Sequence, residues 1–240
     1  MIVFAGLGIS KDDVPLKLIE TAKDMDEIYI EFYTSLVPGV TKEYLENLLN
    51  KKIKVLERSD LEERSDEILK KAKDKKIMIL VPGDPMVFTT HHSIWLEAKK
   101  MKIKTEIIHA TSIYSAAISS SGLQVSKFGR SVTLPLRFNE EEYASICKNI
   151  AENKKRGLHT LILLEITKGD HLSIKDAIER LKDVIDEKII VLARIGSSDQ
   201  TIEYNTVINL SKKDFGKPPL VIIIPGKLHF AEKEFLESLK

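Results

Sequence analysis

Short apolar runs alternate along the chain with longer segments whose apolar residues recur at helical spacing. The apolar runs predict strands at Ile2–Ala5, Glu27–Glu31, Ile77–Val81, Thr105–Ile108, Val132–Leu134, Thr160–Leu164, Ile189–Ala193 and Leu220–Ile224. The amphipathic segments predict helices at Pro15–Ala22, Thr41–Leu49, Ser65–Lys73, Thr90–Lys100, Glu140–Asn153, Ser173–Asp186 and Glu232–Leu239. Several runs are apolar throughout, as in parallel sheets covered on both faces. The pattern predicts an α/β fold with mainly parallel strands at the core.

A length of 240 residues predicts one large domain or two small ones. The segment Ser119–Gly122 ends a predicted helix, and Lys127–Arg130 leads into a new strand. We therefore expect an N-terminal α/β domain over residues 1–122 and a C-terminal α/β domain over residues 123–240. No linker rich in proline, glycine or serine separates them.

Composition narrows the class of protein. Lysine plus arginine number 37 and aspartate plus glutamate 36, so the net charge of +1 argues against direct nucleic-acid binding and against a basic membrane surface. A single cysteine, Cys147, excludes an intramolecular disulfide and a cysteine-based zinc site. The histidines lack metal-ligand spacing, so we expect no metal. Without a leader or a membrane-length apolar stretch, a cytoplasmic protein is expected.

The loops after the predicted strands carry the candidate chemistry, because ligands bind beyond the carboxyl ends of parallel strands. The loop Gly6–Ser10 follows the first strand, and its two glycines allow close approach of the backbone to a ligand. A dinucleotide fingerprint would need a third glycine where Lys11 stands. An ordinary tight turn remains the alternative.

Three further loops stand out in the same way. In Val81–Val87, Pro85 forces Asp84 into an extended conformation and turns its carboxylate out of the strand end. The segment His109–Ala116 follows a strand and opens a helix whose free amides favour an anion. In the second half, Lys217–Leu220 holds two prolines that fix an extended entry into a strand.

Taken together, these loops resemble those of the diphthine synthases, a family within the tetrapyrrole-methylase-like class of S-adenosylmethionine-dependent enzymes. The resemblance covers nearly the full length. The shared runs include Gly6–Gly8, Glu31–Leu36, Pro82–Pro85, Thr89–His91, Ser112–Ala116, Lys127–Gly129, Arg156–Leu161, Leu192–Arg194, Pro218–Pro219 and Pro225–His229. The glycine loop and Pro82–Pro85 belong to the wider class, whereas Glu31–Ser35, Ser112–Ala116 and Pro225–His229 are specific to the diphthine synthases.

The resemblance implies a cofactor site. It implies S-adenosylmethionine, converted to S-adenosylhomocysteine, in the cleft between the two domains, with no metal. The implied cofactor contacts are Ile9, Asp84, Val87, Ser112, Ile113, Leu164, Ile195 and Leu220. Ile195 and Leu220 depart from the residues frequent in the family, and main-chain contacts would tolerate such changes.

The implied reaction is trimethylation of the amino group of a 3-amino-3-carboxypropyl-histidine on translation elongation factor 2, giving diphthine in diphthamide biosynthesis. The elongation factor is then the protein substrate, and the resemblance also implies a homodimer. No catalytic residue is assigned; the candidates that could face the substrate are Glu31, Tyr33 and His109. The alternatives are a precorrin-type tetrapyrrole methylase, a nucleotide-binding oxidoreductase and a non-catalytic module that binds a translation factor.

Overall fold

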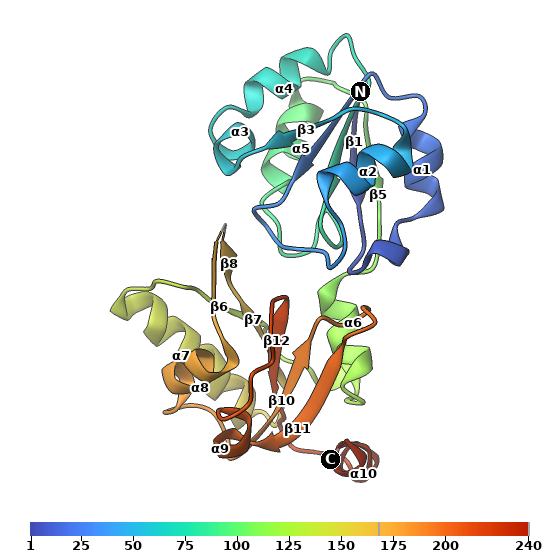
Figure 1. Cartoon of the computed structure of the whole chain (residues 1–240). Coiled ribbons are helices and arrows are strands. Elements are labelled where there is room, and N and C mark those ends of the chain that lie inside the picture. The colour runs from blue at the N-terminus through green and yellow to red at the C-terminus, as the bar shows by residue number, and fades with distance from the viewer. Residues whose placement is uncertain (168, 240) are drawn as a thin grey trace. The chain divides into compact units, whose positions relative to one another are not determined.

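The strand–helix alternation builds two separate five-stranded sheets, one in each of two structural units (Figure 1). The computed structural model describes residues 1–167 and 169–239. The first unit is Met1–Ile113 and the second is Tyr114–Lys240. The expected boundary at residue 122 lies just beyond α6 (Ile113–Ser120), so the two divisions differ in the unit that receives this helix.

The first unit has a fully parallel sheet in the order β3-β2-β4-β1-β5. Its strands are β1 (Ile2–Gly6), β2 (Glu27–Glu31), β3 (Ile53–Leu56), β4 (Ile77–Val81) and β5 (Thr105–Ile108). Its helices are η1 (Lys11–Asp13), α1 (Leu16–Ala22), α2 (Lys42–Leu49), α3 (Arg58–Glu62), α4 (Ser65–Lys71) and α5 (His92–Lys100).

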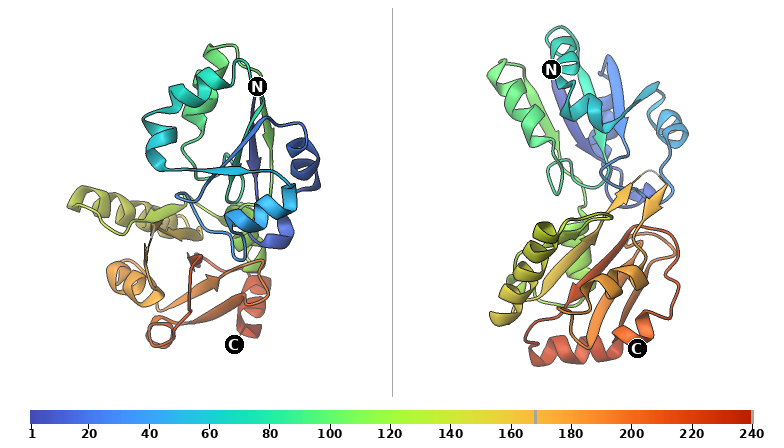
Figure 2. Two further views of the ribbon diagram at one scale, coloured as in Figure 1. Left: turned by 45° about the horizontal axis from the view of Figure 1, so that its top comes forward. Right: turned by 90° about the vertical axis from the view of Figure 1, so that its left-hand side faces the viewer.

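Helices cover both faces of this sheet, which explains why the inner strands β1 and β4 are apolar and buried along their whole length. Alternate residues of β1 divide between the faces: Val3 packs with α1 and α2, whereas Phe4 packs with α3, α4 and α5. The right-hand view of Figure 2 shows α2 and α5 on opposite sides of the sheet. The expected parallel α/β core is confirmed for this unit.

The second sheet corrects the expectation of parallel strands for the other half. Its order is β11-β10-β12-β7-β6, and only β6 and β7 pair in parallel. An apolar run indicates that both faces of a strand are buried, and it carries no information on strand direction. Both β10 and β12 are buried in this way, although they are antiparallel. The strands are β6 (Val132–Leu134), β7 (Thr160–Leu164), β10 (Lys188–Ala193), β11 (Thr201–Thr206) and β12 (Leu220–Ile224), beside the small hairpin of β8 (Ile166–Thr167) and β9 (Asp170–His171).

Besides α6, the helices of the second unit are η2 (Val125–Lys127), α7 (Glu140–Lys155), α8 (Ile174–Leu181), α9 (Val207–Leu210) and α10 (Phe230–Ser238). Four of them, α7, α8, α9 and α10, begin at a polar residue whose side chain caps them. Asn139 and Ser173 accept hydrogen bonds from the first-turn amides of α7 and α8. The helix expected over Ser173–Asp186 ends at Leu181. A tight turn follows, in which the Val184 amide donates a hydrogen bond to the Leu181 carbonyl oxygen (2.9 Å).

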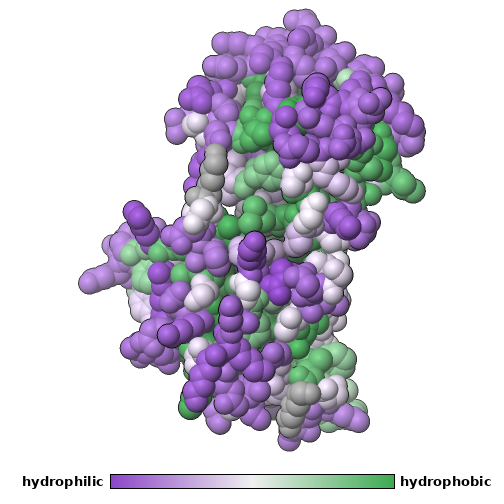
Figure 3. Space-filling view, in the orientation of Figure 1, coloured by the Kyte–Doolittle hydropathy of each residue, from purple (hydrophilic) through white to green (hydrophobic). Residues whose placement is uncertain are grey.

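The surface is mainly hydrophilic in the view of Figure 3, in keeping with a chain of which 30% is charged. Among the described residues, every helix is too short or too polar to cross a bilayer.

One buried carboxylate joins three segments of the second unit that are distant in sequence. Glu232, on α10, is 1% exposed. It accepts hydrogen bonds from the His229 and Gln124 amides (2.7 and 2.9 Å), from the Lys127 ammonium group and from His159 Nε2 (3.1 Å). His159 Nδ1 in turn accepts from the amide of Gly226 (2.8 Å), so its proton lies on Nε2.

We expect Glu232→Gln to lower the free energy of unfolding of the second unit by about 3 kcal/mol, because an amide group cannot accept all four hydrogen bonds. Burial raises the pKa of Glu232, but the hydrogen bonds outweigh it and hold that pKa at about 2. The contribution to stability is therefore full above the ordinary pKa of a glutamate and is lost as the pH falls toward 2. Urea denaturation between pH 3 and pH 7 measures both effects.

The control is Glu234→Gln, which changes an exposed glutamate on the same helix and should alter the free energy of unfolding by less than about 0.5 kcal/mol. Equal effects of the two variants would contradict the prediction.

Candidate active site

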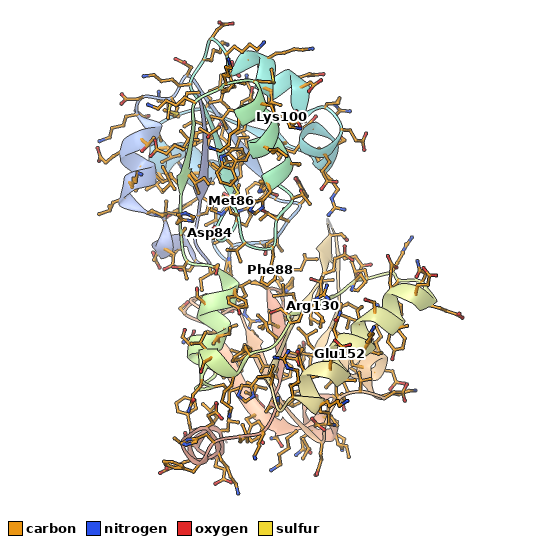
Figure 4. The ribbon with its side chains drawn as sticks, turned by 180° about the vertical axis from the view of Figure 1, so that it is seen from behind. Asp84, Met86, Phe88, Lys100, Arg130 and Glu152 are labelled. Atoms are coloured by element: carbon orange, nitrogen blue, oxygen red, sulfur yellow. The ribbon has the colours of Figure 1, made fainter. Side chains whose placement is uncertain are left out.

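Four neighbouring strands of the first sheet end at one edge, and their loops carry most of the candidate residues. The order β2-β4-β1-β5, with every pair parallel, brings together the loops that begin at Glu31, Val81, Gly6 and Ile108. Figure 4 shows Asp84, Met86 and Phe88 at this end of the unit, with Lys100 at the other. The structure thus assembles Ile9, Asp84, Val87, Ser112 and Ile113 along one sheet edge.

The loops after β1 and β4 are in direct backbone contact. The Gly8 amide donates to the Gly83 carbonyl (3.2 Å), and the Gly83 amide donates to the Gly8 carbonyl (2.9 Å). A Cβ atom on Gly6 would lie 2.4 Å from the Gly83 oxygen and 2.8 Å from the Ala110 Cβ. Glycine is therefore required at position 6 by the close approach of three loops.

Asp84 links the loop after β4 to the loop after β5. Its side chain is 7% exposed. Oδ1 accepts from the Met86 amide (3.0 Å), whereas Oδ2 accepts from the Ala110 amide (3.3 Å) and from His109 Nδ1 (2.8 Å). A carboxylate with these partners ties the loop after β4 to the loop after β5.

The remaining predicted contacts of the first unit surround this centre. Ile9, Val87 and Ile113 are half-buried, and Ser112 is 8% exposed. The Ile9 amide donates a hydrogen bond to Asp13 Oδ2 (3.3 Å). This bond joins the glycine loop to η1, which follows it in the chain. The His109 side chain is 72% exposed, so its ring can meet a ligand.

A fully enclosed pair lies beneath the edge. Glu31 and His91 are both 0% exposed, and Glu31 Oε1 lies 3.9 Å from His91 Nε2. Glu31 Oε2 accepts from the Tyr33 and Thr34 amides (3.0 Å each), and Oε1 accepts from the Thr34 hydroxyl. His91 Nδ1 lies 3.1 Å from the Pro85 carbonyl oxygen. Because a carbonyl only accepts, Nδ1 carries the proton. The pair therefore connects the loop after β2 to the loop after β4.

Burial dominates the protonation of this pair. It raises the pKa of Glu31 to about 6, against the opposing effect of its hydrogen bonds, and it lowers the pKa of His91. It also raises the pKa of the neighbouring Tyr33 to about 12. The sequence patterns did not predict this contact: they marked His91 as a histidine without metal-ligand spacing and as part of the shared run Thr89–His91. Its position four residues after the loop Val81–Val87 was the available signal.

The three predicted contacts of the second unit also lie together, at one edge of the second sheet. Leu164 ends β7, Ile195 follows β10 and Leu220 begins β12. Because β12 is antiparallel to both neighbours, its start lies beside their ends: Leu220 pairs with Ala193, and Val221 pairs with Leu163. All three residues are less than 10% exposed.

Within residues 1–167 and 169–239, no cluster of three histidine, cysteine, aspartate or glutamate side chains is placed to hold a metal ion. The edge of the first sheet instead offers backbone groups, one exposed imidazole and the space beside Gly83. A Cβ built on Gly83 would meet only the Thr111 carbonyl oxygen, at 4.0 Å.

Comparison with known proteins agrees with this geometry. The family of tetrapyrrole (corrin/porphyrin) methylases matches residues 1–210. The diphthine synthase of Methanocaldococcus jannaschii is 43% identical over 256 aligned positions, which cover 100% of this chain and 98% of that protein. The diphthine synthase of Methanococcus vannielii has the same identity and coverage.

Solved structures give the same result. A diphthine synthase crystal structure superposes with a TM-score of 0.92 at 36% identity, covering 99% of this chain and 95% of the other. A putative diphthine synthase from Entamoeba histolytica gives 0.87 at 30% identity, covering 100% and 98%. The chain therefore belongs to the tetrapyrrole methylases and is an S-adenosylmethionine-dependent methyltransferase. Within that class it belongs to the diphthine synthases, the methyltransferases of diphthamide biosynthesis.

We expect Gly6→Ala to weaken binding of S-adenosylmethionine at least tenfold, because its Cβ would push the Gly83 and Ala110 loops apart. The overpacking should also destabilise the first unit by about 1–3 kcal/mol. Calorimetric titration gives the affinity. Gly157→Ala is the control, because Gly157 (φ +70°) lies at the opposite end of β7 from Leu164, so the change strains a turn in the second unit only. Unchanged affinity in Gly6→Ala would contradict the prediction.

The buried Glu31 should make stability depend on pH. Since its folded pKa is raised to about 6, its contribution is full below the ordinary glutamate pKa and is lost as the pH rises through 6. The free energy of unfolding of the wild type, relative to Glu31→Gln, should fall by about 2 kcal/mol from pH 4 to pH 7. Denaturation at stepped pH measures this difference. With the exposed Glu63→Gln the difference should stay flat; a flat difference for Glu31→Gln would show that the carboxylate is not destabilised by burial.

Proposed function

We propose that this protein transfers methyl groups to the amino group of the 3-amino-3-carboxypropyl side chain of a modified histidine on translation elongation factor 2, and that three transfers give diphthine. Membership of the diphthine synthases and their 43% identity over the full length carry this proposal. We further propose that the enzyme acts as a cytoplasmic homodimer, as the family resemblance implies.

The residues at the first sheet edge fit the cofactor. S-adenosylmethionine, when bound, supplies an electrophilic methyl group on a sulfonium centre, so the reaction needs neither a metal nor a covalent enzyme intermediate. We propose that the backbone at Ile9, Val87, Ser112 and Ile113 holds the cofactor beside the open space at Gly83. The proposal includes Leu164, Ile195 and Leu220 of the second unit as further contacts, on the basis of the resemblance.

The protein's own contribution is then mainly positioning. Alignment of an acceptor with a bound reagent accounts for effective molarities of up to roughly 10⁵–10⁸ M in well-oriented pairs. The glycine contacts and the Asp84 hydrogen bonds hold the edge rigid, as alignment requires. The acceptor amine must also lose one proton before each transfer. After the third transfer no N–H bond remains, which ends methylation at nitrogen.

A precorrin-type methylase remains the alternative from the same class, because the family match alone includes both substrate types. The matches of 43% identity are to diphthine synthases, which favours the protein substrate. A non-catalytic module that binds a translation factor would need none of the glycine contacts at the sheet edge.

The test is incubation of elongation factor 2 that carries the unmethylated intermediate with this protein and S-adenosylmethionine, followed by mass spectrometry. We expect three added methyl groups on the single modified histidine. Elongation factor with the unmodified histidine is the control and should gain none. A fourth group would indicate further methylation of the carboxylate, and transfer to a tetrapyrrole instead of the elongation factor would reject the proposed substrate.

A further inference from the structure

We propose that His109 is the general base of the methyl transfer and that Asp84 is the residue that orients it. This inference rests on the proposed function, since it assigns the proton that the acceptor amine must lose.

The tautomer of His109 follows from its contact with Asp84. His109 Nδ1 lies 2.8 Å from Asp84 Oδ2, and the same oxygen accepts from the Ala110 amide (3.3 Å). The other oxygen of Asp84 accepts from the Met86 amide (3.0 Å). A carboxylate surrounded by donors is an acceptor, so the proton between the two side chains belongs to Nδ1. His109 Nε2 is then left with a lone pair, which is the atom a base uses.

The exposure of the two side chains fits their proposed roles: the orienting carboxylate of Asp84 is buried, and the imidazole of His109 that would act as the base is exposed. The Asp84 side chain is 7% exposed and is fixed by two backbone amides, so it cannot rotate away from the ring. The His109 side chain is 72% exposed, so Nε2 can meet an acceptor and can then release its proton to water. Among the described contacts, Asp84 is the titratable side chain that touches this ring.

The other candidates are less suited to the role. Glu31 is 0% exposed, and its oxygens are engaged by the amides of Tyr33 and Thr34 and by the Thr34 hydroxyl. The pKa of Tyr33, raised to about 12 by burial, leaves almost no phenolate to act as a base near neutral pH. Imidazole exchanges protons readily in that range. His109 also lies on the same loop as Ser112 and Ile113, the proposed cofactor contacts.

The proposed step balances as follows. One N–H bond of the acceptor ammonium breaks, the proton moves to His109 Nε2, and the electron pair of that bond stays on nitrogen. This pair forms the new N–C bond as the C–S bond of the methyl donor breaks and its electrons remain on sulfur. The imidazolium returns the proton to solvent before the next cycle, so three protons leave for three methyl groups.

The test compares His109→Gln with the wild type in single-turnover transfer of the first methyl group, from pH 6.5 to pH 9.5. His92→Gln, which changes an exposed histidine of the same unit outside the proposed site, is the matched control. We expect the rate of His109→Gln at pH 7 to fall about 10²–10⁴-fold. The deficit should shrink as the pH rises, because solvent then deprotonates the amine, while calorimetric affinity for S-adenosylmethionine stays unchanged. A pH profile parallel to that of the wild type would overturn the proposal.

A second readout does not depend on activity. Nitrogen-15 chemical shifts of the His109 ring in the protein without substrate should show the Nδ1–H tautomer, and Asp84→Asn should shift the population toward Nε2–H. An Nε2–H tautomer in the wild type would overturn the assignment. If the wild type transfers no methyl group to the elongation factor, the proposed function fails, whereas the tautomer still decides whether Asp84 orients His109.

Discussion

The first unit depends on the close approach of the loops after β1, β4 and β5. Parallel pairing of β1 with both neighbours brings three chain turns to one edge, where a side chain at position 6 would collide with the Gly83 oxygen. Asp84 then satisfies donors from its own loop and from the β5 loop. Because these loops are already ordered, a ligand that binds their backbone groups does not incur the entropy cost of ordering them.

Burial separates the titratable groups near this edge into two kinds. Glu31 and His91 are enclosed, and burial favours the neutral form of each. They connect two loops and stay out of reach of a substrate. His109 is exposed and is held by a buried carboxylate. Imidazole and carboxylate groups are thus enclosed in one pair, while in the other pair the imidazole is exposed, and only their surroundings distinguish them.

The runs that mark the diphthine synthases in sequence do not all concern the cofactor. Lys127, His159 and the segment Gly226–His229 converge on the buried carboxylate of Glu232. A Cβ on Gly226 would lie 2.5 Å from the Gly157 oxygen, so this glycine too is required by close packing. These residues attach α10 to the start of β7. Part of the family's sequence pattern is therefore explained by the stability of the second unit.

Hydrophobic periodicity by itself determined eight of the strands to within one residue. Six of these, β1, β2, β4, β7, β10 and β12, lie in the interior of a sheet and are mostly buried. It missed the edge strands β3 and β11, in which polar residues interrupt the apolar ones, and the two-residue strands β8 and β9. It also could not show that the second sheet is mostly antiparallel. Strand direction depends on connections between distant segments. The motifs placed most of the candidate residues on loops that the structure gathers at one edge of each sheet. The enclosure of Glu31, its contact with His91 and the hydrogen bond from His109 to Asp84 came only from tertiary structure. Burial and side-chain pairing across 25 or more residues of sequence are properties of the folded chain, and local sequence carries no record of them.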